Sequence, residues 1–284
     1  MNYALKFAGT TSSYAKCQPF TIPTNAFTLY LAVRNTNVTT NAGFFSYASS
    51  QSDNAILIIQ NTYIDILIAG NTYTTNFTIK DNITHIITVA WERTTGLCEV
   101  YLDGIFKCKS VISKGITLVS GGCCILGQDQ DAVGGSFQSS QSLNGTLDEL
   151  KIYSVKHNAD KIAMRWNRTA ILSDEGLNSY YRFDEGTGTK TYNLKNTSLN
   201  VFTLIGVAWV SSEYNIKYYR FLIKDGNITE TTNNGVDLIN IGDVTSINQS
   251  NFVDKGFLDL ENAINITSVN KLINNKYSIA LYKK

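Results

Sequence analysis

The segment from Ile125 to Lys161 constrains the fold more than any other part of the chain. It reads ILGQDQDAVGGSFQSSQSLNGTLDELKIYSVKHNADK, so an acidic loop containing glycine is followed by a strand-like pattern and then by a helix start. In LDELKIY, apolar and polar residues roughly alternate, which is the period of a β-strand buried on one face. The segment therefore predicts a strand in a β-sheet, preceded by a loop that carries many side-chain oxygens.

The loop before that strand could bind a metal ion. Its side-chain oxygens belong to Asp129, Gln130, Asp131, Gln138 and Gln141, and a Gly-Gly pair gives the backbone freedom. Hard divalent cations such as calcium take several oxygen ligands from carboxylates, amides and the backbone. The alternative is a loop in which Asp side chains only bond the nearby backbone. Both interpretations are open on these residues alone.

Composition favours a β-rich protein with a substantial core. The 284 residues include only 2 prolines and 16 tyrosines, together with many Thr, Ile and Val, and 43% are hydrophobic. The net charge is +1 and the basic residues are scattered, so no nucleic-acid surface is expected. No apolar run approaches the roughly 20 residues of a membrane span. A strand pattern follows Met1 directly, without the pattern of a secretory signal, so secretion by that route is not expected.

The five cysteines do not follow a metal-binding pattern. No C-x-x-C spacing occurs, and the adjacent Cys123 and Cys124 should face opposite sides of a strand. We expect reduced thiols that act mostly as small core or loop residues. A Cys98–Cys108 disulfide across the Asp103-Gly104 hairpin is the alternative, and it needs an oxidising compartment.

Turn signals divide the chain into two units. Residues 1–212 contain short strand patterns between turns, which predicts an antiparallel two-sheet jelly-roll sandwich. One helix is expected from His157 to Trp166, with Asn158 or Asp160 as its cap. Tyr181, Phe183 and Trp209 are assigned to core or edge packing. The predicted core includes Leu5, Phe7, Phe27, Leu29, Ile86, Val89, Trp91, Leu150 and Ile152.

Residues 213–284 predict a small α+β module. Asp225-Gly226 and Asn234-Gly235 are hairpin turns, and KYSIALYKK is a final strand. Short helices are expected over residues 251–255 and 270–273. A unit of about 70 residues has a small core, so attachment to a partner or to copies of the chain is expected to stabilise it.

Catalytic side chains are not arranged in a recognisable pattern. Asp148 and Glu149 are adjacent and should point to opposite faces of their strand, so they do not form the paired carboxylates of a glycosidase. Asp184 and Glu185 share this defect. His85 is expected to have a hydrogen-bonded structural role, and His157 to be exposed. We therefore predict a non-enzymatic protein. A glycan hydrolase is the alternative if carboxylates from distant strands meet in the fold.

Four segments, in a shared order, resemble the pentraxins. They are the opening ALKFAGTTSSYAK, then FFSYASSQSDNAILII with Asp53 and Asn54, then HIITVAWERTTGLCEVYLDG, and lastly the acidic loop with its NGTLDE strand. The resemblance covers about residues 1–165. The chain also resembles laminin-G-like domains, both in the NGTLDE strand and in the later segment YYRFDEG. The resemblance implies a concanavalin A-like jelly-roll sandwich in which Asp53 and Asn54 join the acidic loop at one calcium.

The resemblance also shows departures. The disulfide of the pentraxins is absent, because the matching positions are Tyr30 and Ile87. Asp129 stands where the family usually has a Glu, and Gln138 stands where it has another Glu. The implied metal ligands are Asp53, Asn54, Asp129, Gln130 through its backbone carbonyl, Asp131 and Gln141. The missing charge at Gln138 predicts one calcium and argues against a second.

These observations predict a binding and architectural protein. The last 70 residues loosely resemble modules that end bacteriophage tail proteins, which favours a virion protein of a tail, fibre or appendage. Its partners would be other virion or surface proteins and copies of itself, without membrane insertion. The resemblance implies a surface glycan or a phosphorylated headgroup as ligand. The alternative is a bacterial adhesin or lectin that is secreted or held at the cell surface.

Overall fold

The computed structural model describes residues 3–36 and 41–214 in full, and the backbone of six short strands beyond them. The chain divides into two compact units, one built from residues 1–166 and 170–215, and the other from residues 167–169 and 216–284. Each unit is described by itself below. The predicted boundary at residue 212 lies close to this division.

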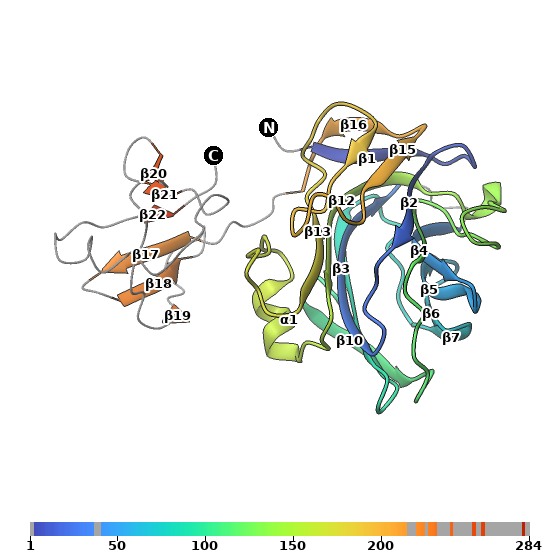
Figure 1. Cartoon of the computed structure of the whole chain (residues 1–284), viewed down its shortest axis with the longest axis horizontal. Coiled ribbons are helices and arrows are strands. Elements are labelled where there is room, and N and C mark those ends of the chain that lie inside the picture. Colours follow the sequence, from blue (N-terminus) through green and yellow to red (C-terminus); the bar gives the residue numbers. More distant parts are fainter. Residues whose placement is uncertain are drawn as a thin grey trace. The chain divides into compact units, whose positions relative to one another are not determined.

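The first unit is a sandwich of two antiparallel sheets (Figure 1), as the turn spacing predicted. Sheet A has the order β10-β9-β8-β3-β12-β1-β16, and β13 also pairs with β12. The strands of sheet A are β1 (Tyr3–Ala8), β3 (Ala26–Asn35), β8 (Thr84–Glu92), β9 (Leu97–Leu102), β10 (Ile105–Val111), β12 (Asn144–Tyr153), β13 (Leu177–Tyr181) and β16 (Ala208–Ser211).

Sheet B packs against sheet A and has the order β14-β15-β2-β11-β4-β5-β6-β7. Its strands are β2 (Tyr14–Phe20), β4 (Ala42–Ser49), β5 (Ser52–Gln60), β6 (Ile64–Ile68), β7 (Asn71–Thr74), β11 (Gly122–Leu126), β14 (Lys190–Thr191) and β15 (Phe202–Ile205). The inner faces of both sheets meet in one large apolar cluster. Every side chain predicted for the core is buried.

A second apolar cluster covers the outer face of sheet A. Helix α1 (Ala159–Arg165) contributes Ile162 to it, and Asn158 caps the helix by accepting a hydrogen bond from the Lys161 backbone N–H. Ile86 lies in this cluster and not in the main core, which corrects the predicted location of this one residue. The cluster buries the part of β12 from Lys151 to Tyr153, so that strand is covered on both faces there.

The prediction that His157 is exposed was wrong. Its side chain is 2% exposed and contacts the rings of Tyr30 and Tyr153 in the second cluster. The Nδ1 atom lies 2.8 Å from the Tyr30 hydroxyl. Burial, followed by nearby positive charges, lowers the pKa of His157 to about 3, so the ring is neutral at pH 7. Local sequence could not show this, because Tyr30 is far away along the chain.

The alternation predicted for LDELKIY is interrupted. The pairing of β12 with β3 shifts between Leu147 and Leu150, and both of these leucines face the main core. Asp148 and Glu149 occupy the bulge and are 7% and 4% exposed. Burial raises the pKa of both carboxyls, the charge of Asp184 raises them further, and the charge of Arg182 lowers them. The expectation that Asp148 and Glu149 simply face opposite sides therefore fails at this bulge.

The register between β3 and β8 also corrects the two positions that were matched to the pentraxin disulfide. Tyr30 pairs with Thr88, whereas Ile87 pairs with Leu31. Tyr30 and Ile87 therefore face opposite sides of sheet A, and Leu31 is the cross-strand neighbour of Ile87. All five cysteines are free and four are buried, so the Cys98–Cys108 bridge is not formed.

The second unit contains a sheet with the order β19-β18-β17-β22-β21-β20. Its strands are β17 (Arg220–Lys224), β18 (Asn227–Thr231), β19 (Ile239–Asn240), β20 (Phe252–Val253), β21 (Phe257–Leu258) and β22 (Ala280–Leu281). β17 and β18 pair in the antiparallel way that the predicted hairpin requires, and β22 lies within the predicted final strand. The turns predicted at Asp225-Gly226 and Asn234-Gly235 lie outside the described residues. The helix expected over residues 251–255 was wrong, because Phe252 and Val253 pair with β21. The helix expected over residues 270–273 lies outside the described residues.

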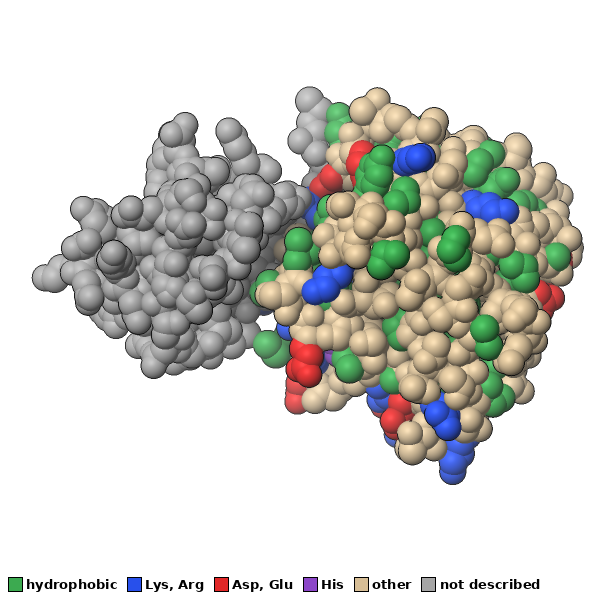
Figure 2. All heavy atoms as spheres, in the orientation of Figure 1, with side chains coloured by type: hydrophobic (Ala, Val, Ile, Leu, Met, Phe, Trp, Pro, Cys, Tyr) green, Lys and Arg blue, Asp and Glu red, His purple; other side chains and the backbone are tan. Residues whose placement is uncertain are grey.

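Charged side chains are spread over the face of the sandwich that Figure 2 shows, among many neutral ones. No strongly basic surface gathers there, in keeping with the net charge of +1. Within the described ranges, no helix combines the length and the apolar character needed to cross a membrane.

We predict that residues 1–212 fold without the second unit. Their core is made by strands that lie within this range, and the last of them, β16, completes one edge of sheet A through its pairing with β1. A protein of residues 1–212 should therefore unfold cooperatively and resist limited proteolysis. Circular dichroism with thermal melting checks this. A soluble but non-cooperative product would mean that the second unit is needed for the first to fold.

Candidate functional site

The acidic loop connects β11 to β12 and is fixed at both ends. Gly127 donates a backbone hydrogen bond to the Phe44 carbonyl at 3.3 Å, and Leu143 donates one to the Gly127 carbonyl at 3.0 Å. A short 3-10 helix, η1 (Ser139–Gln141), ends the loop. The loop is therefore held over β4 of sheet B, on the side of the sandwich opposite to α1.

The side chain of Gln130 anchors the middle of the loop. It is fully buried, and its Nε2 donates to the carbonyls of Ser46 at 2.9 Å and Cys123 at 3.1 Å. Its Oε1 accepts a hydrogen bond from the Gly134 backbone at 2.7 Å. With its side chain committed to the protein, Gln130 has its backbone carbonyl left for a ligand, as the pentraxin resemblance implies.

Gly43 allows the loop to approach sheet B closely. A Cβ added to this residue would lie 2.5 Å from the Asp129 backbone nitrogen and 2.5 Å from the Gln128 carbonyl carbon. Non-bonded atoms do not approach this closely, so only glycine permits the observed path. Gly43 thereby sets the position of Asp129, although its own sequence context carries no sign of this role.

Asp129 is the central acid of the site. It is 4% exposed, and its Oδ2 accepts a hydrogen bond from the Gln141 Nε2 at 3.1 Å. Burial, then the charge of Asp131 and, to a smaller extent, that of Asp53, raise its pKa to about 6. The fold thus brings Asp53, from the start of β5, within electrostatic reach of a loop residue that is 76 positions later in the chain.

Three oxygens, one of them on this acid, are buried and receive no hydrogen bond from any described residue. They are Asn54 Oδ1, Asp129 Oδ1 and Gln141 Oε1. Buried acceptors in folded proteins normally have a donor, and those that lack one require an explanation. A bound cation supplies what a donor would, and oxygens of carboxylates and amides are the ligands that calcium prefers. These oxygens are therefore suitable ligands for a hard cation.

The remaining predicted ligands lie at the rim of the site. Asp53 is exposed and accepts a hydrogen bond from the Asn54 backbone at 2.9 Å. Asp131 is also exposed, and Gln138 donates to its Oδ2 at 2.6 Å. In the part of the chain that the structure describes, no three side chains of His, Cys, Asp or Glu form a metal centre by themselves. An ion here would need the amide and backbone oxygens as well.

His85 forms a different polar cluster, on β8. Its Nδ1 lies 2.7 Å from Asp103 Oδ2, and its Nε2 lies 2.9 Å from Asp81 Oδ2. The hydrogen bond with Asp103, and then that with Asp81, outweigh burial and raise the pKa of His85 to about 9. The imidazolium at pH 7 thus ties the loop at Asp81 to the hairpin at Asp103, which is the structural role expected from the sequence.

We expect His85→Gln to destabilise the protein in a pH-dependent way. The pKa of His85 is raised on folding, so its stabilisation is complete below the unfolded pKa of about 6.5 and is lost as the pH rises through about 9. Urea unfolding should show a loss of about 1–2 kcal/mol at pH 7, after allowance for solvent screening, and little loss at pH 10. His157→Gln is the control. His157 is neutral over that range, so the stability lost in this variant should not change with pH.

Comparisons with known proteins agree with this architecture. A family model described as the Pentaxin family matches residues 6–178. C-reactive protein of Homo sapiens is 32% identical over 157 residues, which span 54% of this chain and 69% of that protein. A heptameric SAP-like pentraxin from Limulus polyphemus has a similar fold, with a TM-score of 0.59 and 17% identity over 75% of this chain and 96% of its own.

A carbohydrate-binding protein from Bacteroides ovatus, described as putative, also shares the fold. Its TM-score is 0.58 at 14% identity, over 75% of this chain and 60% of the other. At this identity the likeness concerns the fold alone. The family match covers more than half of the chain and includes the acidic loop. By its sequence and its sandwich, the chain is a member of the pentraxin family.

Proposed function

We propose that the sandwich is a non-enzymatic binding domain that holds one calcium ion in the acidic loop and binds a ligand through it. The observation that carries this proposal is the set of three buried oxygens without hydrogen-bond donors on Asn54, Asp129 and Gln141. Their arrangement costs the folded protein stability unless a cation is present, because unpaired buried acceptors lose their hydration. The resemblance to the pentraxins implies the same residues as ligands of the ion.

The ligands of the ion would be Asp53, Asn54, Asp129, Asp131, the Gln130 carbonyl and Gln141. These give three negative charges and three neutral oxygens, which suits calcium better than zinc or copper. A second ion finds less support, because Gln138 is neutral and its amide already donates to Asp131. The carboxylates would bind the ion and orient it, and the ion would attract oxygens of an incoming ligand.

A glycan or a phosphorylated headgroup is the proposed ligand. Both present oxygens that can complete the coordination of a hard cation. The exposed position of Asp53 and Asp131 at the rim leaves the site open to such a group. The fold shared with the protein from Bacteroides ovatus that is described as a putative carbohydrate-binding protein favours the glycan.

For the biological setting we propose display on a virion, in a tail, fibre or other appendage. The resemblance of residues 213–284 to phage tail modules supports it, and that unit would attach the sandwich to a virion or surface protein or to its own copies. The heptamer formed by the Limulus polyphemus pentraxin supports self-association. The alternative remains a bacterial adhesin or lectin that is secreted or held at the cell surface.

A glycan hydrolase is the second candidate function. Asp148 and Glu213 come from distant parts of the chain and line one pocket on sheet A. Burial raises the pKa of Asp148 to about 8, and a general acid needs a carboxyl that stays protonated near pH 7. Release of reducing sugar from any glycan that the protein binds, and its loss in Asp148→Asn, would support hydrolysis over binding alone.

Calorimetry with calcium and then a glycan array test the binding proposal. The protein should bind one calcium per chain, and glycan signals should disappear with EDTA. The Asp129→Ala, Asp131→Ala double variant should lose both. The double variant Asp160→Ala, Glu175→Ala removes the same charge from exposed positions away from the loop and should keep both. Absence of calcium binding at millimolar concentration would rule the proposal out.

A further inference from the structure

A second group of charged residues lies on the outer face of sheet A and is not used by the calcium loop. Strand register places Lys6 of β1 beside Thr146 of β12, Thr146 beside Arg34 of β3, and Arg34 beside Thr84 of β8. The four residues therefore form one row across the sheet, with Lys6 and Arg34 two strands apart. Neighbouring strands are about 4.8 Å apart, so the backbones of Lys6 and Arg34 are about 10 Å apart along this row.

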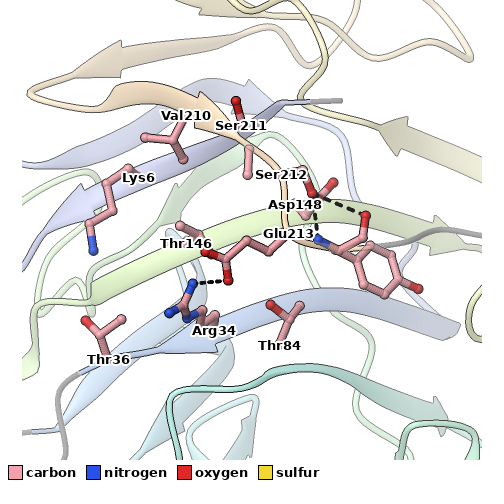
Figure 3. Close-up of a pocket in the computed structure, with 12 residues that line it drawn as sticks. Lys6, Arg34, Thr36, Thr84, Thr146, Asp148, Val210, Ser211, Ser212 and Glu213 are labelled. Atoms are coloured by element: carbon pink, nitrogen blue, oxygen red, sulfur yellow. Dashed lines mark hydrogen bonds and ion pairs between the residues drawn. The ribbon is translucent and has the colours of Figure 1, made fainter. Parts of the chain in front are cut away.

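The row forms the floor of a pocket of about 230 Å³ (Figure 3). The last residue of β16, Ser211, forms one wall together with the residues after it up to Tyr214, and Thr36 directly follows β3. The threonine hydroxyls can donate or accept hydrogen bonds. All of these residues belong to the first unit. The pocket is on sheet A, whereas the acidic loop packs on sheet B.

Asn82 holds the side chain of Arg34 in place, and the guanidinium of Arg34 contacts the carboxylate of Glu213. Its Nε donates to the carbonyl and to the side-chain Oδ1 of Asn82, both at 3.0 Å. Its Nη1 forms an ion pair with the carboxylate of Glu213. The side chain of Glu213 is 70% exposed, so this partner can move into solvent at little cost. The chain's own carboxylate thus shows that an oxyanion fits at Arg34.

Lys6 is the second cation of the pocket. Its Nζ donates to the Asn144 Oδ1 at 3.3 Å, and no ion pair of Lys6 is found in the described residues. Burial and the charge of Arg34 both lower the pKa of Lys6. The two cations repel each other, and an anion between them would relieve that repulsion. Asp148, the other acid of the pocket, is bonded by Ser212 and is mostly protonated at pH 7, so it opposes an anion little.

We propose that this pocket is a second, calcium-independent ligand site, which takes the carboxylate or sulfate group of an acidic carbohydrate between Arg34 and Lys6. Glu213 occupies Arg34 until the ligand arrives and then moves into solvent. The oxyanion accepts hydrogen bonds from both cations, and the threonines of the floor bond the sugar hydroxyls. The site thus goes beyond the calcium-dependent function proposed above and does not depend on it.

The test is a calorimetric titration of the whole chain in EDTA, with a sulfated disaccharide in one arm and a glucuronate-containing disaccharide in the other. We expect saturable binding of at least one probe, and the stronger arm identifies the oxyanion. Arg34→Gln should weaken the affinity for the disaccharide about tenfold or more, and Lys6→Gln should weaken it several-fold, since a charged hydrogen bond is lost in each case. Glu213→Gln should strengthen it about three- to tenfold, because the internal competitor is gone.

Two control variants separate a defined site from diffuse charge. Glu92→Gln makes the same charge change as Glu213→Gln, at the half-buried end of β8. Lys107→Gln matches Lys6→Gln. Neither control should change the affinity. Equal effects of Glu92→Gln and Glu213→Gln would overturn the proposal, as would no binding in EDTA. If Arg34→Gln does not fold, Arg34→Lys tests the same contact, because an ammonium cannot replace the guanidinium held by Asn82. Binding that appears only with calcium would overturn this site and leave the calcium proposal standing.

Discussion

Saturating calcium should raise the melting temperature of the protein by about 5–10 °C. At a calcium concentration 100 times the dissociation constant, binding to the folded state alone adds about 2.7 kcal/mol to the free energy of unfolding. For a domain of about 200 residues, each kcal/mol shifts the melting temperature by roughly 2–4 °C. The three oxygens without donors near Asp129 gain partners at the same time.

The pH dependence of this effect follows from Asp129. Its pKa is raised on folding from 3.8 to about 6, so without calcium the stability present at low pH is lost as the pH rises from about 4 to 6. Calcium needs the ionised carboxylate and competes with the proton. We therefore expect the calcium-induced rise in melting temperature to be large at pH 7.5 and to shrink well below pH 6.

Differential scanning fluorimetry at pH 7.5 and pH 5, with calcium or EDTA, measures both effects. Asp129→Asn should remove the calcium response at pH 7.5, and should make the calcium-free protein more stable there because a buried charge is gone. Asp160→Asn, on the exposed side of α1, is the matched control and should respond as the wild type does. An equal calcium response in Asp129→Asn would show that the ion stabilises some other part of the chain.

The fold was predictable from sequence where local patterns and core packing agree. The turn spacing gave two antiparallel sheets, and residues such as Trp91 and Phe27 pack against each other in the core as expected. Prediction failed where distant residues decide the outcome. His157 is buried because Tyr30 and Tyr153 surround it. The bulge at Asp148 depends on how β12 pairs with β3, and no local pattern shows it.

The candidate ligands of the site come from the sequence and stay a prediction, whereas the contacts that hold the loop in place could not be predicted. The oxygen-bearing residues of the acidic loop can be read from the sequence, and the resemblance to the pentraxins adds Asp53 and Asn54. The anchoring of Gln130 by Ser46 and Cys123 joins positions that sequence alone does not relate. The pocket of Arg34 and Glu213 could not be foreseen either, because these residues are 179 positions apart and meet only through the pairing of β16 with β1.

Gly43→Ala should disable the calcium loop without touching any ligand. The new Cβ would lie 2.5 Å from the Asp129 nitrogen, and the atoms it meets are backbone, which cannot rotate away. The loop must then lift from β4, which moves Asp129 away from Gln141 and Asn54. We expect calcium affinity to fall at least about tenfold and the free energy of unfolding to fall by about 1–3 kcal/mol, as for other overpacked sites.

Gly135→Ala is the matched control for this variant. Gly135 lies in the same loop, an added Cβ there meets no atom within 4 Å, and its backbone is not in the left-handed region. Its calcium affinity and stability should stay close to those of the wild type, as calorimetry and urea unfolding would show. Equal calcium binding by Gly43→Ala and wild type would mean that the close approach to β4 does not position Asp129. The ion would then depend on the exposed rim residues Asp53 and Asp131, because a rim site does not need the loop to lie against the sheet.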